Sequence, residues 1–364
     1  MTGNARNQTL RTISLTVAAI ILCSAFLSAQ ESSGISPLSD YMYKKDLDKY
    51  EAIKKEANSQ KRGDMLIGLL KERPISRLLL YIATDYMETL KPLIDQKNYT
   101  QFIAKAEALQ ALLPTQQTVN AAQIPVGVED FMKDQLQPTQ KLIFTSLAGA
   151  YYESKNLAKA AELGEQAYKL APNDKSLVII LFNAYNQLNN EAKLLTYGNK
   201  MLEIFPIAEP QGYGTALQMA QIYIKKQDVK SATQLYTKVM GVYGDKTPAG
   251  WQEGNWNQTR LVGYTLMAQD EYNQKDYPNA EKLYQKVLSL DPKRDDAYYF
   301  LGMCRWQSKD QVGAIGFFAR SVVLNKTYAQ KARKYLEDLY KAEHNNSLDG
   351  LDQALAKAKS ELGI

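Results

Sequence analysis

The feature of this chain that most constrains its fold is a self-similarity with a period of 34 residues. Residues of matching type recur at this spacing in three pairs: Tyr151 and Tyr185, Pro172 and Pro206, and Ala280 and Ala314. Around them, amphipathic stretches alternate with short breaks rich in Asn, Gly, Asp or Pro, and no strand-like alternation appears. A repeat of this length is one helical hairpin, which buries its apolar side only against its neighbours. The sequence therefore predicts an all-α chain of stacked hairpins.

Two segments carry a family resemblance most fully. Residues 146–172 (SLAGAYYESKNLAKAAELGEQAYKLAP) and 272–292 (YNQKDYPNAEKLYQKVLSLDP) resemble the tetratricopeptide repeat. The resemblance places five repeats at 141–174, 175–208, 213–246, 261–294 and 295–328. It implies a right-handed α-solenoid of tetratricopeptide-type helical hairpins.

In this family, small residues let the two helices of one hairpin approach closely. The first-helix position is filled in the five repeats by Ala148, Phe182, Ala220, Ala268 and Gly302. The second-helix position is filled by Ala160, Leu194, Ala232, Ala280 and Ala314. Because Phe182 and Leu194 both depart from the pattern, the repeat at 175–208 is the least typical of the five.

Outside the five repeats the pattern weakens. Residues 40–116 predict divergent helical hairpins, with residues 60–64 (QKRGD) as one of their turns. Residues 117–140 predict a partly ordered connection. Residues 329–364 predict C-terminal capping helices, because the last repeat of a solenoid otherwise exposes an apolar face.

Residues 1–29 have the layout of a secretory signal peptide. A polar start with Arg6 and Arg11 precedes an apolar run over residues 13–27, and Ala29 lies before the expected cleavage site. The alternative is an uncleaved anchor, but the run is shorter than the roughly 20 residues that a membrane helix needs. We therefore expect cleavage after Ala29.

Further sequence features indicate where the protein is located. Leu22 precedes Cys23, whereas a bacterial lipid-attachment cysteine follows a small residue, so we expect no lipid anchor. Residues 30–39 predict a flexible leader, and no later segment is apolar enough to span a membrane. Exported relatives of the repeat family and the lack of a cysteine pair favour a bacterial periplasm or cell envelope.

Composition excludes several classes of function. Without the signal peptide the chain holds 42 basic and 39 acidic residues, a balance that does not favour nucleic acid. Its remaining cysteine and histidine are Cys304 and His344, so His- and Cys-based metal centres and catalytic triads are excluded. The paired acids Asp295 and Asp296 are interpreted as solvated helix faces or caps. We predict no enzymatic activity, no metal and no cofactor.

The candidate binding surface follows from the resemblance. In the family, five first-helix positions line a concave groove. In this chain these positions hold Thr145, Tyr152 and Glu153, then Asn183, Asn186 and Gln187, then Gln221, Ile224 and Lys225, then Gln269, Tyr272 and Asn273, and last Tyr299, Met303, Trp306 and Gln307. Amide side chains both donate and accept hydrogen bonds, which suits an extended peptide backbone. Aromatic faces suit apolar side chains, proline or sugar rings.

One ligand class is disfavoured by the same positions. Related chaperone cofactors hold a terminal carboxylate with Lys and Arg at two of the groove positions. None of the residues at these two positions is basic. In the five repeats the first position holds Thr145, Ile179, Leu217, Thr265 and Tyr299, and the second holds Gly149, Asn183, Gln221, Gln269 and Met303. A terminal carboxylate is therefore not the expected ligand.

The insertion 247–260 (TPAGWQEGNWNQTR) lies between the third and fourth repeats. Insertions in repeat proteins map to loops, often on the binding face. Trp251 and Trp256 in a Gly- and Asn-rich loop resemble the aromatic chemistry of binding loops. The alternative is that the tryptophans fill an apolar gap between repeats, or that the insertion lengthens the next helix. The sequence leaves both interpretations open.

These observations favour a non-enzymatic exported scaffold or adaptor that binds a protein or peptide partner. A second hypothesis is binding of glycan or peptidoglycan through the aromatic groove and the tryptophan loop. A third is an outer-membrane assembly subunit, against which the missing lipid-attachment sequence argues. The sequence identifies neither the partner nor the oligomeric state.

Overall fold

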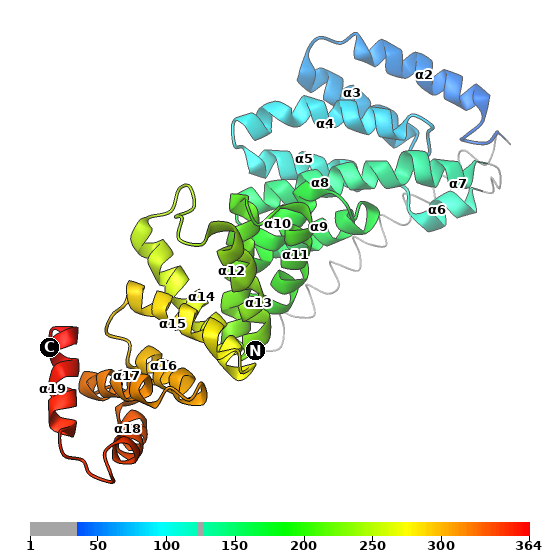
Figure 1. Ribbon diagram of the computed structural model, residues 1–364. Coiled ribbons are helices and arrows are strands. Elements are labelled where there is room, and N and C mark those ends of the chain that lie inside the picture. The colour runs from blue at the N-terminus through cyan, green and yellow to red at the C-terminus, as the bar shows by residue number, and fades with distance from the viewer. Residues whose placement is uncertain (1–34, 123–126) are drawn as a thin grey trace, which may run out of the picture. The chain divides into compact units, whose positions relative to one another are not determined.

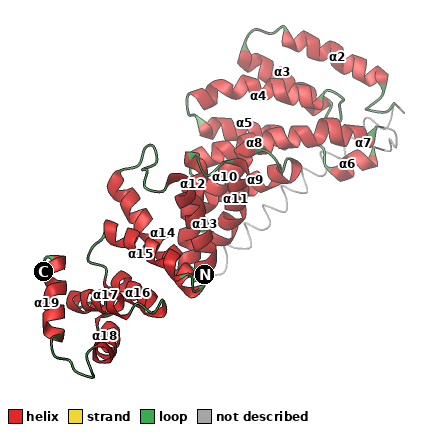
Figure 2. Cartoon of the chain, in the orientation of Figure 1, coloured by secondary structure: helices red, strands yellow, loops and turns green. Residues whose placement is uncertain are grey.

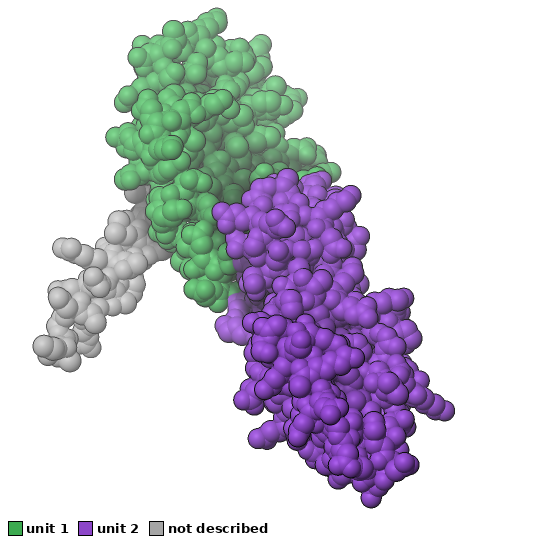
Figure 3. Space-filling view, turned by 60° about the vertical axis from the view of Figure 1, so that its left-hand side comes forward, with its two compact units in different colours: residues 1–190 green, residues 191–364 purple. Residues whose placement is uncertain are grey.

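The computed structural model describes residues 35–122 and 127–364, and the expected signal peptide lies outside them. Within the described residues the chain is helical and has no strand, which confirms the predicted all-α class (Figure 2). The chain divides into two compact units, residues 1–190 and residues 191–364 (Figure 3). The division falls between the two helices of the predicted repeat 175–208.

Figure 1 shows the helices in chain order. Those of unit 1 are α2 (Asp40–Lys54), α3 (Ser59–Glu72), α4 (Leu79–Asp95), α5 (Tyr99–Gln110), α6 (Gln116–Ala121), α7 (Val128–Phe131), the π-helix η1 (Met132–Leu136), α8 (Gln137–Glu153), α9 (Leu157–Leu170) and α10 (Lys175–Gln187). Those of unit 2 are α11 (Glu191–Ile204), α12 (Pro210–Lys225), α13 (Val229–Tyr243), α14 (Glu253–Asn273), α15 (Tyr277–Leu290), α16 (Asp295–Gln307), α17 (Gln311–Leu324), α18 (Ala329–Glu343) and α19 (Leu351–Leu362). In each unit most helices that follow one another in sequence pack side by side, whereas α5 also packs on α8 and α19 packs on α17. None of the described helices is long and apolar enough to cross a membrane.

One kind of turn recurs after the first helix of a hairpin. The second residue beyond that helix has a φ of 54–66° at Lys97, Lys155, Asn189, Gln227, Lys275 and Lys309. The next residue caps the second helix through a side-chain oxygen that accepts an amide hydrogen bond at Asn98, Asn156, Asp228, Asp276 and Asp310. Such a cap typically contributes about 1 kcal/mol. The divergent α4–α5 hairpin therefore shares its turn with the repeats.

Small side chains lie where the helices of a hairpin touch. The alanines at the predicted contact positions are fully buried: Ala148, Ala160, Ala220, Ala232, Ala268, Ala280 and Ala314. At Gly302 on α16, a Cβ atom would lie 2.7 Å from the ring of Phe318 on α17, closer than carbon atoms pack. These positions set how closely the paired helices approach.

Ala280→Leu is expected to lower the free energy of unfolding by about 1–3 kcal/mol, because three added carbons must enter a closed contact between α14 and α15. The measurement is a chemical denaturation curve. Ala158→Leu, at an exposed position of α9, is the control and should leave the midpoint nearly unchanged. An unchanged midpoint for Ala280→Leu would contradict the assigned helix contact.

Residues 60–64 lie inside α3, so the turn expected there is wrong. Asn58 begins the helix earlier, since its Oδ1 atom accepts a hydrogen bond from the amide of Lys61 at 2.9 Å. Gly63 is not a turn residue but a contact residue, because a Cβ atom on it would lie 2.9 Å from Oγ1 of Thr89 on α4. The glycine at position 63 therefore reflects the close packing of α3 on α4 and not a turn.

Two further segments are more helical than expected. The connection 117–140 contains most of α6, all of α7 and η1, and the first turn of α8. In the insertion 247–260, α14 begins at Glu253, so only the first half of the insertion is a loop. The lengthened-helix interpretation is therefore the correct one for residues 253–260.

Candidate functional site

A cavity of about 640 Å³ lies in unit 1, lined mainly by the first helices α4, α8 and α10 and in part by α5. Its apolar lining consists of Met87, Ile94, Phe102, Leu142, Ala150 and Ile180. Its polar lining includes Glu88, Lys91, Asp95, Thr145, Tyr152 and Glu153. Residues 87, 88, 91, 94 and 95 recur at helical spacing, which places them on one face of α4. We call this cavity the α4–α8–α10 groove.

Gly149 borders open space in the groove. It lies on α8 within the lining, and a Cβ atom on it would meet no other atom within 4 Å. A helix-interior glycine costs roughly 0.5–1 kcal/mol relative to alanine, and no close packing at this position offsets that cost. The open space at Gly149 is thus available to a ligand.

Hydrogen-bonding groups lie beside the apolar lining. Oγ1 of Thr145 is enclosed and has no hydrogen-bond partner among the described residues. Nε2 of Gln187 on α10 donates to the hydroxyl of Tyr152 on α8 at 2.9 Å, and the ammonium of Lys155 lies 5.6 Å from the centre of the same ring. The groove therefore offers apolar surface together with a few oriented polar groups, as ligand sites do.

The structure brings some of the predicted groove residues together in unit 1. Thr145, Tyr152 and Glu153 line the groove. Asn186 and Gln187 are exposed on α10, and Asn183 is half-buried there. The α4 residues were missed, because that hairpin lacks the family's small-residue signature. The shared Lys97–Asn98 turn is the signal that identifies it as a related hairpin.

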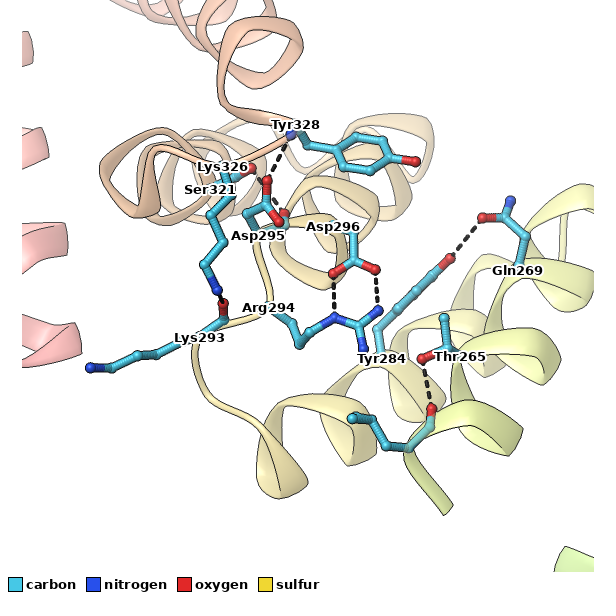
Figure 4. Close-up of polar contacts among 11 residues, drawn as sticks. Thr265, Gln269, Tyr284, Lys293, Arg294, Asp295, Asp296, Ser321, Lys326 and Tyr328 are labelled. Carbon is cyan, nitrogen blue, oxygen red and sulfur yellow. Dashed lines mark hydrogen bonds and ion pairs between the residues drawn. The ribbon is translucent and has the colours of Figure 1, made fainter. Parts of the chain in front are cut away.

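In unit 2 the predicted amides are only partly available. Gln221 and Lys225 are exposed on α12, and the ammonium of Lys225 forms an ion pair with Glu191 at 2.6 Å. Oε1 of Gln269 accepts a hydrogen bond from the hydroxyl of the buried Tyr284 at 3.3 Å (Figure 4). Nε2 of Gln269 donates to the exposed Asn273 at 3.2 Å. Gln269 therefore links the helices of its hairpin.

The predicted aromatic residues of unit 2 pack on one another. Tyr299 is buried, with its ring centre 5.0 Å from that of Tyr328, and burial raises its pKa to about 12. The expectation that Tyr299 lines an open groove is therefore wrong, because residues before and on α18 cover it. Tyr272 and Trp306 are half-buried. Their ring centres lie 5.3 Å from Phe300 and from Tyr335, respectively.

The acids at the start of α16 have structural partners (Figure 4). Asp295 is buried, and its carboxylate accepts the backbone amide of Tyr328 at 2.7 Å. Asp296 forms a two-pronged ion pair with Arg294. The expectation of solvated faces is wrong for Asp295, whose role is to fix the segment that leads into α18.

The insertion packs inward. Trp256 is fully buried on α14, with its ring centre 6.0 Å from that of Tyr243 and 5.8 Å from that of Trp251. Trp251 is half-buried and lies 6.0 Å from Tyr213. The binding-loop interpretation is therefore wrong for Trp256. The alternative, in which the tryptophans fill an apolar gap, describes the arrangement.

Among the described residues, the single thiol and the single imidazole form no reactive site. Cys304 is buried, and burial raises its pKa to about 12, so the thiol stays protonated and unreactive. His344 is exposed and stacks on Tyr340 with ring centres 3.9 Å apart. In the part of the chain that the structure describes, no group of His, Cys, Asp and Glu side chains could hold a metal ion.

Several known structures are similar to this chain. A tetratricopeptide repeat protein from Parabacteroides merdae is 12% identical, with 82% of this chain and 98% of that chain covered and a TM-score of 0.31. YrrB, described as a tetratricopeptide repeat protein with an unusual peptide-binding site, is 14% identical, with 60% and 100% covered and a TM-score of 0.34. The TPR2AB domain of yeast Sti1 in a complex with pHSP90 is 14% identical, with 88% and 99% covered and a TM-score of 0.30. No curated protein matches the sequence.

A family comparison is more informative. The sequence model of the tetratricopeptide repeat matches residues 265–332, a range that includes α15, α16 and α17. The match coincides with buried Ala280, Gly302 and Ala314 at the positions where paired helices touch. With the 34-residue period and the recurring capped turn, it identifies the chain as a member of the tetratricopeptide repeat family.

Proposed function

We propose that this protein is an exported, non-enzymatic scaffold that binds an extended segment of a protein partner in the cell envelope through the α4–α8–α10 groove. The groove itself carries the proposal. Its volume of about 640 Å³ lies within the range of about 300–1,000 Å³ that is usual for ligand sites. The first helices α4, α8 and α10 supply most of its lining, with Tyr99 and Phe102 added from α5, and in this family the first helices form the ligand-facing surface.

The chemistry of the groove suits a peptide. Ile94, Leu142 and Ile180 can receive an apolar side chain, and burial of such a side chain is favourable by roughly 1.5–3 kcal/mol. The hydroxyl of Tyr152 accepts a hydrogen bond from Gln187 and can still donate one, so it can pair with a C=O group of a ligand backbone. Apolar anchoring and backbone pairing together favour an extended peptide.

The glycan hypothesis loses part of its basis. It relied on the tryptophan loop and on an open aromatic groove, but Trp256 and Tyr299 are buried. No arrangement in the described residues favours sugar stacking over peptide binding. We therefore retain a peptide or protein segment as the proposed ligand.

Gly149→Tyr should abolish peptide binding while the fold remains intact, because the new ring would occupy the open space over α8. Tyrosine has a higher helix propensity than glycine, so stability should rise slightly, by a few tenths of a kcal/mol. The measurement is titration of peptides selected from a random displayed library against residues 35–364. Loss of affinity should exceed about 100-fold, or roughly 2.7 kcal/mol.

Gly68→Tyr is the matched control. Gly68 is also a helix-interior glycine of unit 1 with nothing within 4 Å of an added Cβ atom, but it lies on α3 outside the groove. This variant should bind the selected peptides as the unmodified chain does. Equal affinity of the two variants would place the binding surface elsewhere and refute the proposal.

Export has its own test. If the signal is cleaved as expected, native protein purified from the producing cell should begin at or near Gln30 and carry no lipid. N-terminal sequencing and intact mass spectrometry measure both properties. A chain that begins at Met1, or an acylated Cys23, would contradict export by this route.

A further inference from the structure

The α4–α8–α10 groove carries an excess of negative charge. Its lining holds the carboxylates of Glu88, Asp95 and Glu153 but a single ammonium, that of Lys91. None of these four side chains forms an ion pair with another residue in the part of the chain that the structure describes. All four are exposed, so their charges face whatever enters the groove.

The helix ends add to this negative potential. Asp95 is the last residue of α4 and Glu153 the last residue of α8, so both line the groove at the carboxyl ends of their helices. Such an end carries roughly half a negative charge on its free carbonyls. Lys97 and Lys155 follow these ends and offset part of the effect, but neither belongs to the lining.

One backbone carbonyl of α4 lacks its usual helical donor. Pro92 is inside α4 and has no N–H, so it cannot donate the helical hydrogen bond to the carbonyl of Glu88. Glu88 belongs to the groove lining.

From these charges we infer that the groove binds a peptide segment in which an apolar side chain is flanked by Lys or Arg; this inference rests on the proposed function. The apolar side chain would occupy the space between Leu142, Gly149 and Ile180. The flanking cations would lie toward Glu88, Asp95 and Glu153. An acidic segment would instead bring like charges together at these three carboxylates, which is unfavourable.

The test compares two pools of synthetic nonapeptides that share central Leu, Ile or Phe residues. One pool carries Lys and Arg at its flanks, and the other carries Asp and Glu. At an ionic strength of about 0.02 M, where charges are weakly screened, the cationic pool should bind at least about ten-fold tighter by fluorescence anisotropy. The ratio should shrink as salt is raised toward about 0.5 M.

Two triple variants locate the charges responsible. Glu88→Gln, Asp95→Asn and Glu153→Gln together remove the groove carboxylates and should bring the ratio of affinities close to one. Asp48→Asn, Glu51→Gln and Asp64→Asn change the net charge of unit 1 equally at exposed residues outside the groove, and should preserve the ratio. If the groove variant still binds the cationic pool more tightly than the acidic pool by the same factor, the inference is wrong.

The remaining outcomes separate this inference from the proposed function. In one outcome both pools bind equally, or the acidic pool binds more tightly, and Gly149→Tyr abolishes this binding. That result would overturn the charge preference but keep the groove as a peptide site. If neither pool binds, or if binding survives Gly149→Tyr, the groove is not a peptide site and both proposals fail.

Discussion

Trp256→Ala is expected to lower the free energy of unfolding by about 3–5 kcal/mol, the usual cost of removing a buried aromatic side chain. Trp256 is fully buried in the core that α12, α13 and α14 share. Its ring touches those of Tyr243 and Trp251 in edge-to-face contacts. A loss of this size is a large fraction of the stability of an ordinary domain, so a shift of the denaturation midpoint is easily measured.

Two controls separate packing from hydrogen bonding. The indole N–H of Trp256 has no hydrogen-bond partner in the described residues, so Trp256→Phe removes no bond and should cost clearly less than Trp256→Ala. Trp251→Ala, at a half-buried ring, should also cost less. Unchanged stability for Trp256→Ala would show that the ring is on the surface, and the binding-loop interpretation would then return.

Much of the fold could be predicted because the repeat depends on local rules. A small residue such as Ala280 or Gly302 is needed wherever two backbones approach, and a polar cap such as Asp276 is needed wherever the second helix begins. Both requirements recur every 34 residues and leave a pattern in the sequence. The all-α class follows from that pattern without knowledge of tertiary contacts.

The candidate site could be predicted only in part. Thr145, Tyr152 and Glu153 follow from the repeat register, but Met87 and Glu88 on the opposite wall lie in a hairpin that has lost the register. Their helix carries no family signature, and its approach to α8 is a tertiary event. The repeat register therefore predicts the groove residues on α8 but not those on α4.

Side-chain exposure was the least predictable property. Tyr299 occupies a groove position, yet Tyr328 and Tyr335 cover it because the segment around α18 packs across the last repeat. Trp256 resembles a loop tryptophan because its neighbours are Gly and Asn, yet α14 begins three residues earlier. Burial depends on which helix follows, and the periodicity of the repeat itself does not encode this.

A buried ion pair in unit 1 shows that the exposure of charged residues, too, could not be predicted from the sequence. Asp46 on α2 is 1% exposed, although its sequence context is polar. Its carboxylate lies 3.2 Å from Nε of Arg73 at the end of α3, and it accepts a hydrogen bond from the hydroxyl of Ser76 at 2.7 Å. Burial raises the pKa of Asp46 despite both partners, which indicates a costly desolvation of the carboxylate.

Asp46→Leu is expected to lower the free energy of unfolding by about 3–5 kcal/mol, because the largely buried Arg73 would lose its counter-charge. Arg73→Met should also destabilise, since it leaves the carboxylate of Asp46 without a cation. The double variant should recover part of the loss, because an apolar pair of similar size carries no desolvation cost, but it should stay about 1–3 kcal/mol less stable than the unmodified chain, because the buried Ser76 hydroxyl loses its acceptor. Denaturation of all four proteins gives the coupling energy directly. If the double variant loses the sum of the two single losses, Asp46 and Arg73 are not coupled, and the stability of the α2–α3 hairpin depends on packing alone.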